Sequence, residues 1–177
     1  KLDAALAQTA IVGVQTNVQF FRLVLATPSF SQGKLDTALI QRESDRLFKQ
    51  DPLGLDMAVA AAVAQTVLAK RAAESNDPFS RSDGFRSHGI ASRRIDFEYQ
   101  GEPVIAKLRY LNDGLQLKVA DADPAPLSFT PQADGAIDVR YAGQRQVVRI
   151  FRRDEVMHVF GTHGATTITE LDVLRHA

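Results

Sequence analysis

An uncharged stretch of 13 residues, from Met57 to Ala69, limits the possible folds of this chain more than any other feature. Around it, 14 of the 19 residues from Leu55 to Ala73 are apolar, mostly Ala and Val. Val59, Val63 and Val67 recur at a helical spacing of four, and alanines fill the other faces. Because a surface helix carries a charged side, the pattern predicts a helix over Leu55–Ala73 that is enclosed by the rest of the fold.

The charges that flank this stretch agree with a helix. Asp56 suits the positive N-terminal end of a helix, and Lys70 and Arg71 suit its last turns. The uncharged run is shorter than the roughly 20 residues that a bilayer requires. We therefore expect no membrane span.

After about residue 92 the hydrophobic period changes from helical to alternating. Ile95, Phe97 and Tyr99 alternate with charged residues, and about eight such segments follow, separated by turns such as Asn112-Asp113-Gly114. A sheet that closes on itself removes its edges and would enclose the Ala/Val helix. We predict an α+β fold: a long central helix surrounded by an antiparallel β-barrel of about eight strands, preceded by a short helical segment.

The sequence pattern of the first 50 residues predicts the short helical segment that precedes the barrel. We expect one helix over residues 2–10, a second that Thr16 begins with Gln19 as its capping-box partner, and a third from Asp36 or Thr37 to Phe48. The sequence Asp51-Pro52-Leu53-Gly54 then breaks the helical pattern. We predict two parts, residues 1–50 and 51–177.

Composition limits the classes of function. The 177 residues are 45% hydrophobic and carry no net charge, so no overall field attracts nucleic acid or an anionic membrane. The absence of Cys excludes thiolate chemistry and is compatible with a cytoplasmic chain, which we expect. No glycine-rich phosphate loop is present.

Few residues suggest catalysis or metal binding. His158 and His163 lack a matching acidic cluster, and we interpret them as ordinary hydrogen-bonding side chains. Ser82 and His88 could serve a hydrolase, but no nucleophile elbow surrounds the serine. We predict no catalytic, cofactor-binding or metal-binding residue in this chain.

An arginine-rich segment offers an alternative function. On a barrel, these arginines with Tyr141 and Phe151 could bind single-stranded nucleic acid, whereas pairing with nearby aspartates would make them an ordinary solvated face. We favour the second interpretation and expect no nucleic acid. The arginines are Arg140, Arg145, Arg149, Arg152 and Arg153, and the aspartates are Asp134, Asp138 and Asp154.

The segment between the predicted helix and the first strand holds the candidate binding residues. It is polar, yet it contains Pro78, Phe79, Phe85 and Arg86. Phe and Arg are typical anchors at protein interfaces. Two interpretations stay open: the rings bind a partner, or they close the end of the barrel core.

Several motifs resemble the alpha subunit of biotin-dependent acyl-CoA carboxylases, and most closely its 3-methylcrotonyl-CoA branch, with the propionyl, acetyl and geranyl branches as alternatives. The C-terminal end of the biotin carboxylase domain is resembled by four short motifs, at residues 13–17, 20–21, 28–30 and 33–37. The domain that follows it is resembled by two longer ones, DPFSRSDGFR at 77–86 and HVFGTHGATTITELDVL at 158–174. The resemblance implies that residues 1–50 are the end of the carboxylase domain and that residues 51–177 are a helix-in-barrel domain.

The resemblance also implies a function. The barrel would be a non-catalytic assembly domain that docks on the carboxyltransferase beta subunit through the loop at 77–92 and joins the biotin carboxylase and biotin carrier domains of its own subunit. The parent enzyme would use biotin, ATP and Mg or Mn to carboxylate biotin and then an acyl-CoA. Met57 and Met157 have no adjacent Lys, so the biotinyl Met-Lys-Met motif is not in this sequence.

Overall fold

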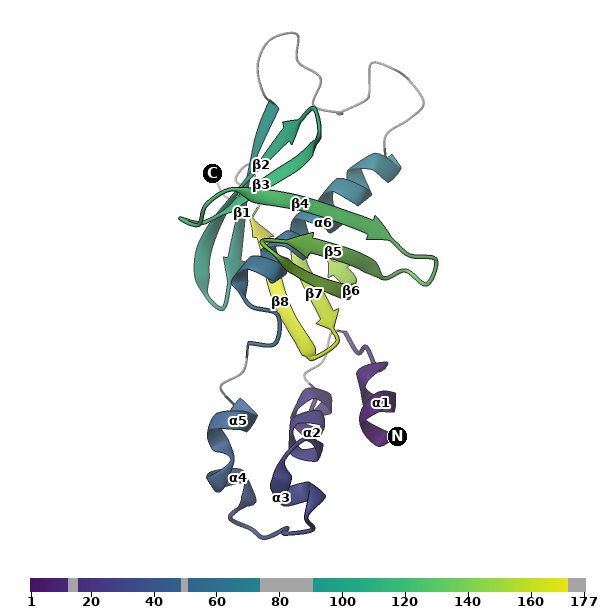
Figure 1. The fold of residues 1–177 in the computed structure, drawn as a ribbon, viewed down its shortest axis with the longest axis vertical. Coiled ribbons are helices and arrows are strands. Elements are labelled where there is room, and N and C mark those ends of the chain that lie inside the picture. Colours follow the sequence, from purple (N-terminus) through teal and green to yellow (C-terminus); the bar gives the residue numbers. More distant parts are fainter. Residues whose placement is uncertain (13–15, 49–50, 74–90, 172–177) are drawn as a thin grey trace.

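The computed structural model describes residues 1–12, 16–48, 51–73 and 91–171. Its helices are α1 (Leu2–Ala7), α2 (Val18–Leu25), α3 (Pro28–Ser31), α4 (Leu39–Arg42), α5 (Ser44–Phe48) and α6 (Leu55–Ala73). Its strands are β1 (Ala91–Tyr99), β2 (Glu102–Leu111), β3 (Gly114–Val119), β4 (Ala125–Pro131), β5 (Ile137–Tyr141), β6 (Gln144–Arg153), β7 (Val156–Gly161) and β8 (Gly164–Leu171). The α1–α5 helices lie at one end of an elongated molecule and the barrel at the other (Figure 1).

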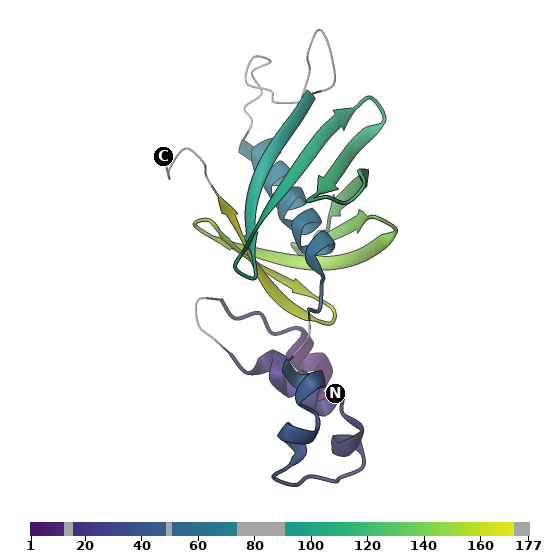
Figure 2. The same ribbon diagram turned by 90° about the vertical axis from the view of Figure 1, so that its left-hand side faces the viewer.

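The α6 helix runs through the barrel, as predicted (Figure 2). Residues 57–64 are all buried, together with Thr66 and Val67, so the helix is covered on every face along its first three turns. An ordinary helix with its side chains is about 10–12 Å wide, and alanine reduces that width so that strands can approach from all sides. The last residues, from Ala69 to Ala73, are exposed beyond the barrel wall.

The eight strands form a closed antiparallel barrel in chain order, which confirms the predicted fold class. Alternate residues point inward, and the largest fully buried strand side chains surround α6: Phe97, Leu108, Leu117, Val119, Val139, Val148, Met157, Val159 and Ile168. Two-residue turns follow the predicted signals, as at Asn112-Asp113 and Ala142-Gly143. β1 meets β8 over residues 96–98 only, whereas it pairs with β2 along its whole length.

The α1–α5 helical segment differs from prediction in three places. α1 ends at Ala7 rather than at residue 10. α2 begins after Asn17, and the predicted Thr16–Gln19 capping box does not form, because the Gln19 amide is engaged by the barrel. The single helix predicted to end at Phe48 is two short ones, since Glu43 leaves helical geometry at φ −100° and ψ 13°.

Across the described ranges, no helix combines the length and the apolar character needed to cross a membrane.

Candidate functional site

The four predicted partner-binding residues, Pro78, Phe79, Phe85 and Arg86, lie in the 74–90 stretch, outside the described residues. The structure does describe the two elements from which this stretch leaves and to which it returns: α6 ends at Ala73 and β1 begins at Ala91. Both positions are at the barrel end farthest from the α1–α5 helices (Figures 1 and 2). We call this end the barrel mouth, and it is the candidate site.

The projecting end of α6 forms one side of the mouth. Lys70 and Arg71 occupy its last turns, where positive side chains interact favourably with the helix dipole. The Arg71 guanidinium carbon lies 5.7 Å from the centre of the Phe129 ring on β4, a cation–π distance. The helix end is thereby held against the barrel wall and presents positive charge to the solvent.

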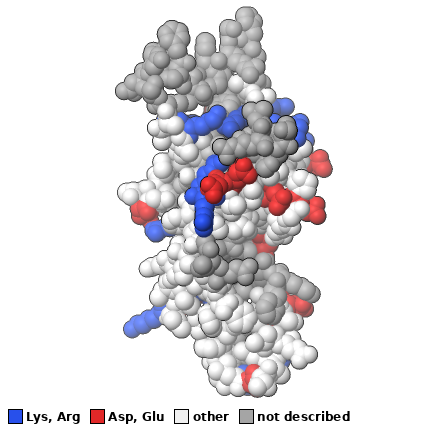
Figure 3. Space-filling view, turned by 180° about the vertical axis from the view of Figure 1, so that it is seen from behind, with Lys and Arg blue, Asp and Glu red and all other residues white. Residues whose placement is uncertain are grey.

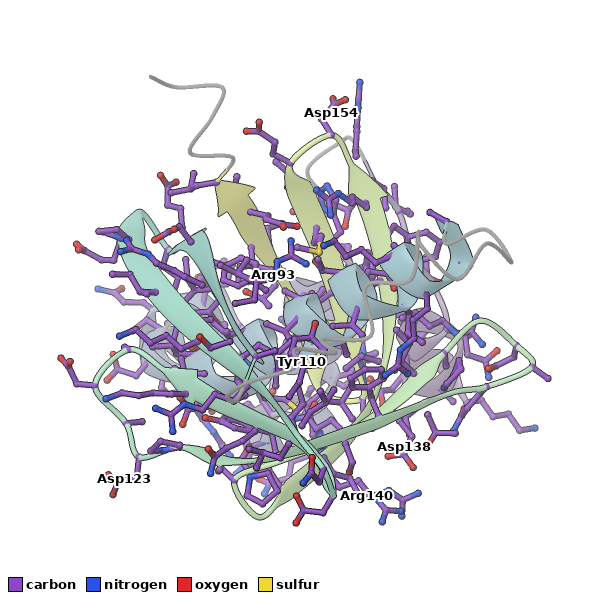
Figure 4. All side chains as sticks on the ribbon, turned by 90° about the horizontal axis from the view of Figure 1, so that it is seen from above. Arg93, Tyr110, Asp123, Asp138, Arg140 and Asp154 are labelled. Carbon is purple, nitrogen blue, oxygen red and sulfur yellow. The ribbon has the colours of Figure 1, made fainter. Side chains whose placement is uncertain are left out.

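An arginine points into the barrel at the mouth. Arg93 occupies an inward position of β1, between buried Ala91 and Ile95. Figure 4, which looks down on the mouth, shows Arg93 and Tyr110 inside the ring of strands, whereas Asp123, Asp138 and Arg140 lie outside it. The Arg93 Nη1 atom is buried and has no hydrogen-bond partner among the described residues. Such an atom is rare in native proteins, where nearly all buried donors are paired.

A second polar group connects α6 to the barrel wall. Glu170 on β8 accepts a hydrogen bond from the Thr66 hydroxyl at 3.1 Å and from Arg152 Nη1 at 2.8 Å. All three positions face inward: Thr66 is buried, and the side chains of Glu170 and Arg152 are partly covered. Inside the barrel Arg152 thus has an acceptor in Glu170, whereas Arg93 Nη1 at the mouth has none among the described residues.

The arginine-rich segment does not form a single surface. Arg152 faces inward on Glu170, whereas Arg145 pairs with Asp138 at 2.8 Å and Arg149 with Asp134 at 2.6 Å on the outside. Figure 3, which shows the back of the molecule, has blue and red side chains intermixed on the barrel. The pairing with Asp134 and Asp138 that we predicted is thus present.

The two aromatic residues that a nucleic-acid surface would need do not share one exposed face either. Tyr141 is buried and donates its hydroxyl proton to the Leu117 carbonyl at 3.1 Å, so its ring cannot stack on a base. Phe151 is 44% exposed and packs edge-to-face on Phe160, with ring centres 5.7 Å apart. One exposed ring among paired arginines is a weak stacking platform.

The ion pairs on the outer face of the barrel help to lower the pKa values of Asp134 and Asp138. The Arg145 side chain, by its hydrogen bond above all, holds the pKa of Asp138 below its usual value of 3.8. For Asp134 the backbone N–H of Ala136 is the main cause, and Arg149 adds to it, so that its pKa is lowered as well. These carboxylates are therefore charged at neutral pH and offset the neighbouring arginines.

Among the described residues, neither the methionines nor the acidic side chains form a biotin or metal site. Met57 and Met157 are buried in the core around α6, which is no environment for a biotinyl attachment segment. Within the described part of the chain, no three His, Asp or Glu side chains gather in a way that could hold a metal ion. The hydrolase pair Ser82 and His88 lies in the stretch that is not described.

Contacts between the helical segment and the barrel were not foreseen from the sequence. Gln19 and Arg22 of α2 donate hydrogen bonds to the carbonyls of His163 and Thr162, in the turn between β7 and β8. Asp51 accepts a hydrogen bond from the Tyr99 hydroxyl at 2.6 Å. No sequence pattern signals a side chain that binds backbone carbonyls 140 residues away.

A single helix inside a closed antiparallel barrel defines a helix-in-barrel domain of the kind expected in biotin-dependent carboxylase alpha subunits. Comparison with known families assigns it more closely. Residues 54–173 match the family described as "Methylcrotonyl-CoA carboxylase, alpha-subunit, BT domain". The chain belongs to this family, which confirms the family predicted from the motifs.

A curated relative gives the same assignment. The chain is 25% identical over 118 residues to the mitochondrial methylcrotonoyl-CoA carboxylase subunit alpha of Dictyostelium discoideum. The match covers 64% of this chain and 17% of that protein. That relative is a mitochondrial protein, and the cytoplasmic location of this chain stays a prediction.

Proposed function

We propose that this BT domain attaches its alpha subunit to the carboxyltransferase beta subunit through the barrel mouth. The observation that carries the proposal is the mouth itself: α6 ends there at Ala73 and β1 begins there at Ala91, so the sequence between them, with Phe79, Phe85 and Arg86, leaves from and returns to this end. Around these two positions lie Arg71 and the inward Arg93.

The charge and packing of the mouth indicate what it would bind. A buried guanidinium nitrogen without an acceptor is stabilised when a carboxylate of a partner accepts its hydrogen bond. Aromatic and Arg side chains also commonly dominate the binding energy of protein interfaces. The matching partner surface has an apolar centre with acidic groups beside it. The interior behind the mouth is filled by α6 and the inward strand side chains. This packing supports attachment, rather than turnover, as the role of the barrel.

We also propose that residues 1–50 are the end of the biotin carboxylase domain and that residues 51–177 form a separate domain. Six of the nine exposed large hydrophobic side chains in the described residues lie in the first 40 residues: Leu2, Ile11, Phe21, Phe30, Leu35 and Ile40. A helical segment with so much exposed apolar surface is typical of a core that another part of the protein completes. The family match begins at Gly54, after this segment.

In the parent enzyme, ATP-dependent carboxylation of biotin would be followed by transfer to an acyl-CoA such as 3-methylcrotonyl-CoA on the beta subunit. We propose that the residues for this chemistry, and the biotin carrier, lie in other domains. Attachment through the BT domain would raise the effective concentration of the carboxylated carrier near the second active site.

The test is the affinity of this chain for a purified beta subunit, measured by calorimetry. The triple variant Phe79→Ala, Phe85→Ala, Arg86→Ala should weaken binding at least tenfold, since such anchors each contribute more than about 1 kcal/mol. A matched control, Val147→Ala, Arg149→Ala, Phe151→Ala, removes two exposed apolar side chains and one arginine from the outer face of β6. Equal affinity for the folded triple variant and the native chain would reject the proposal. An oligonucleotide titration at low salt tests the alternative function.

A further inference from the structure

The turn between β7 and β8 is the place where the α1–α5 helical segment touches the barrel. The Gln19 Nε2 donates to the His163 carbonyl at 2.9 Å, and the Arg22 Nη2 donates to the Thr162 carbonyl at 2.8 Å. Arg22 is also held from its other side, since its Nε donates to Asp3 of α1 at 3.0 Å. The Arg22 side chain is mostly covered. A charged donor in such a setting forms a stronger hydrogen bond than a neutral one.

Gly164 permits this close approach. A Cβ atom at this position would lie 2.5 Å from the Gln19 Nε2, and the backbone has a φ of +153°. A side chain here would therefore push the Gln19 amide away from the turn. Apolar side chains of both parts surround a small cavity beside the turn: Leu6, Ile11, Val18, Phe160 and Ala165.

A second attachment involves the stretch between α5 and α6. Asp51 Oδ1 accepts hydrogen bonds from the Tyr99 hydroxyl at 2.6 Å and from the Gly54 N–H at 3.0 Å. The Thr166 hydroxyl lies 3.5 Å from the same Tyr99 oxygen. Leu53 is buried in the barrel core. The stretch that leads into α6 is thus fastened to the barrel wall on both sides of Pro52.

We propose that Gln19, Arg22 and Asp51 form a rigid joint that holds the barrel in one orientation relative to the α1–α5 helices. Domains joined by a simple linker normally move relative to one another. Here two side chains of α2 bind the turn between β7 and β8, and Asp51, which leads into α6, binds Tyr99 at the same end of the barrel, through donors and acceptors of defined direction. The joint lies at the barrel end opposite the mouth (Figure 1). Its consequence rests on the proposed function: the partner-binding mouth points away from the helical segment in a fixed direction.

The joint can be tested by measuring a distance distribution. The chain contains no Cys, so spin labels can be placed at Ser31→Cys in α3 and Lys107→Cys on β2, both exposed. Electron–electron double resonance on the doubly labelled chain should give one narrow distance peak. Gln19→Ala with Arg22→Ala, and separately Gly164→Ala, should broaden that peak to at least twice its width. Arg94→Ala breaks the exposed ion pair with Asp96 outside the joint and should leave the width unchanged.

Thermal unfolding and affinity for the beta subunit distinguish loss of the joint from unfolding of the barrel and from loss of docking. Thermal unfolding by circular dichroism shows whether each barrel is folded, and Gln19→Ala and Arg22→Ala lie outside the barrel, so they remain informative if Gly164→Ala unfolds. A peak that stays narrow in the double variant, or one already broad in the native chain, would overturn the joint. Affinity for the beta subunit should not change in the double variant because the mouth is intact. Failure of the joint and failure of docking therefore give different results.

Discussion

Thr66 in the enclosed helix donates its hydroxyl proton to Glu170 on β8, with 3.1 Å between the two oxygens. Thr66 is the only polar side chain among the ten buried residues of α6. The same Glu170 oxygen accepts from Arg152 on β6. One carboxylate thus ties the helix to two strands of the wall. In a barrel filled mainly by small apolar side chains, this bond fixes the rotation and depth of α6.

Removal of the carboxylate should cost more than removal of the hydroxyl. Thr66→Val keeps the shape of the side chain and loses one hydrogen bond, whereas Glu170→Ala removes the acceptor of both the Thr66 hydroxyl and the Arg152 Nη1. We expect losses in the free energy of unfolding of about 1 kcal/mol and about 2–3 kcal/mol respectively. Urea unfolding measures both, and the double variant should lose less than the sum. Additive losses would show that the contact is not formed in solution.

The alanines of α6 should tolerate no added volume within the barrel. Ala61 has no exposed surface, whereas Ala72 on the same helix is exposed beyond the wall. Ala61→Leu should destabilise the domain by about 1–3 kcal/mol or more through overpacking. Ala72→Leu should change its stability by less than about 0.5 kcal/mol. Thermal unfolding of the two variants provides the comparison. An unchanged midpoint for Ala61→Leu would mean that the barrel is wider than the structure has it.

These residues show why the core could be predicted from the sequence. An uncharged Ala/Val helix has to be enclosed, and the alternating strands after residue 91 supply the enclosure. Both signals are local in sequence and arise from the burial of apolar surface, so a periodicity argument detects them.

The contacts that orient the parts could not be predicted in the same way. Gln19 was interpreted as a capping-box residue because its spacing from Thr16 fits one, yet its amide binds a turn far away in sequence. The alternation of β1 puts Arg93 on the same face as Ile95, but nothing in the local pattern shows that its guanidinium is buried at the mouth without an acceptor among the described residues. Such contacts depend on tertiary packing. The four predicted partner-binding residues lie outside the described chain and stay a prediction.

The Asp51–Tyr99 contact should make stability sensitive to alkaline pH. Burial, with the hydrogen bond to Asp51 as a second cause, raises the pKa of Tyr99 from 10.0 to about 12. The folded state therefore favours the neutral phenol. This contribution is complete below pH 10 and is lost as the pH rises from 10 to about 12. Burial also raises the pKa of Tyr141, so other tyrosines add to the loss.

Tyr99→Phe isolates the part due to Tyr99. It should lower the free energy of unfolding by about 1 kcal/mol at neutral pH through loss of the hydrogen bond. It should also make stability fall less steeply than in the native chain between pH 10 and 12. Urea midpoints at several pH values measure both effects. Equal slopes for the two proteins would contradict the interpretation of this contact.

Arg93 gives a prediction in which stability and binding change independently. Its Nη1 is buried without an acceptor among the described residues, so the charge costs free energy in the free domain. Arg93→Met keeps the length of the side chain and removes that cost, and the variant should unfold at the same or a slightly higher urea concentration.

If a carboxylate of the partner pairs with the Arg93 guanidinium, the same change should weaken affinity for the beta subunit about tenfold or more, since removal of one side of a buried charge pair costs at least 2 kcal/mol. Arg94→Met, on the outer face of the same strand and paired with Asp96, serves as the control and should leave affinity nearly unchanged. A large loss of stability with unaltered binding would instead make Arg93 a structural residue of the barrel and remove it from the docking surface.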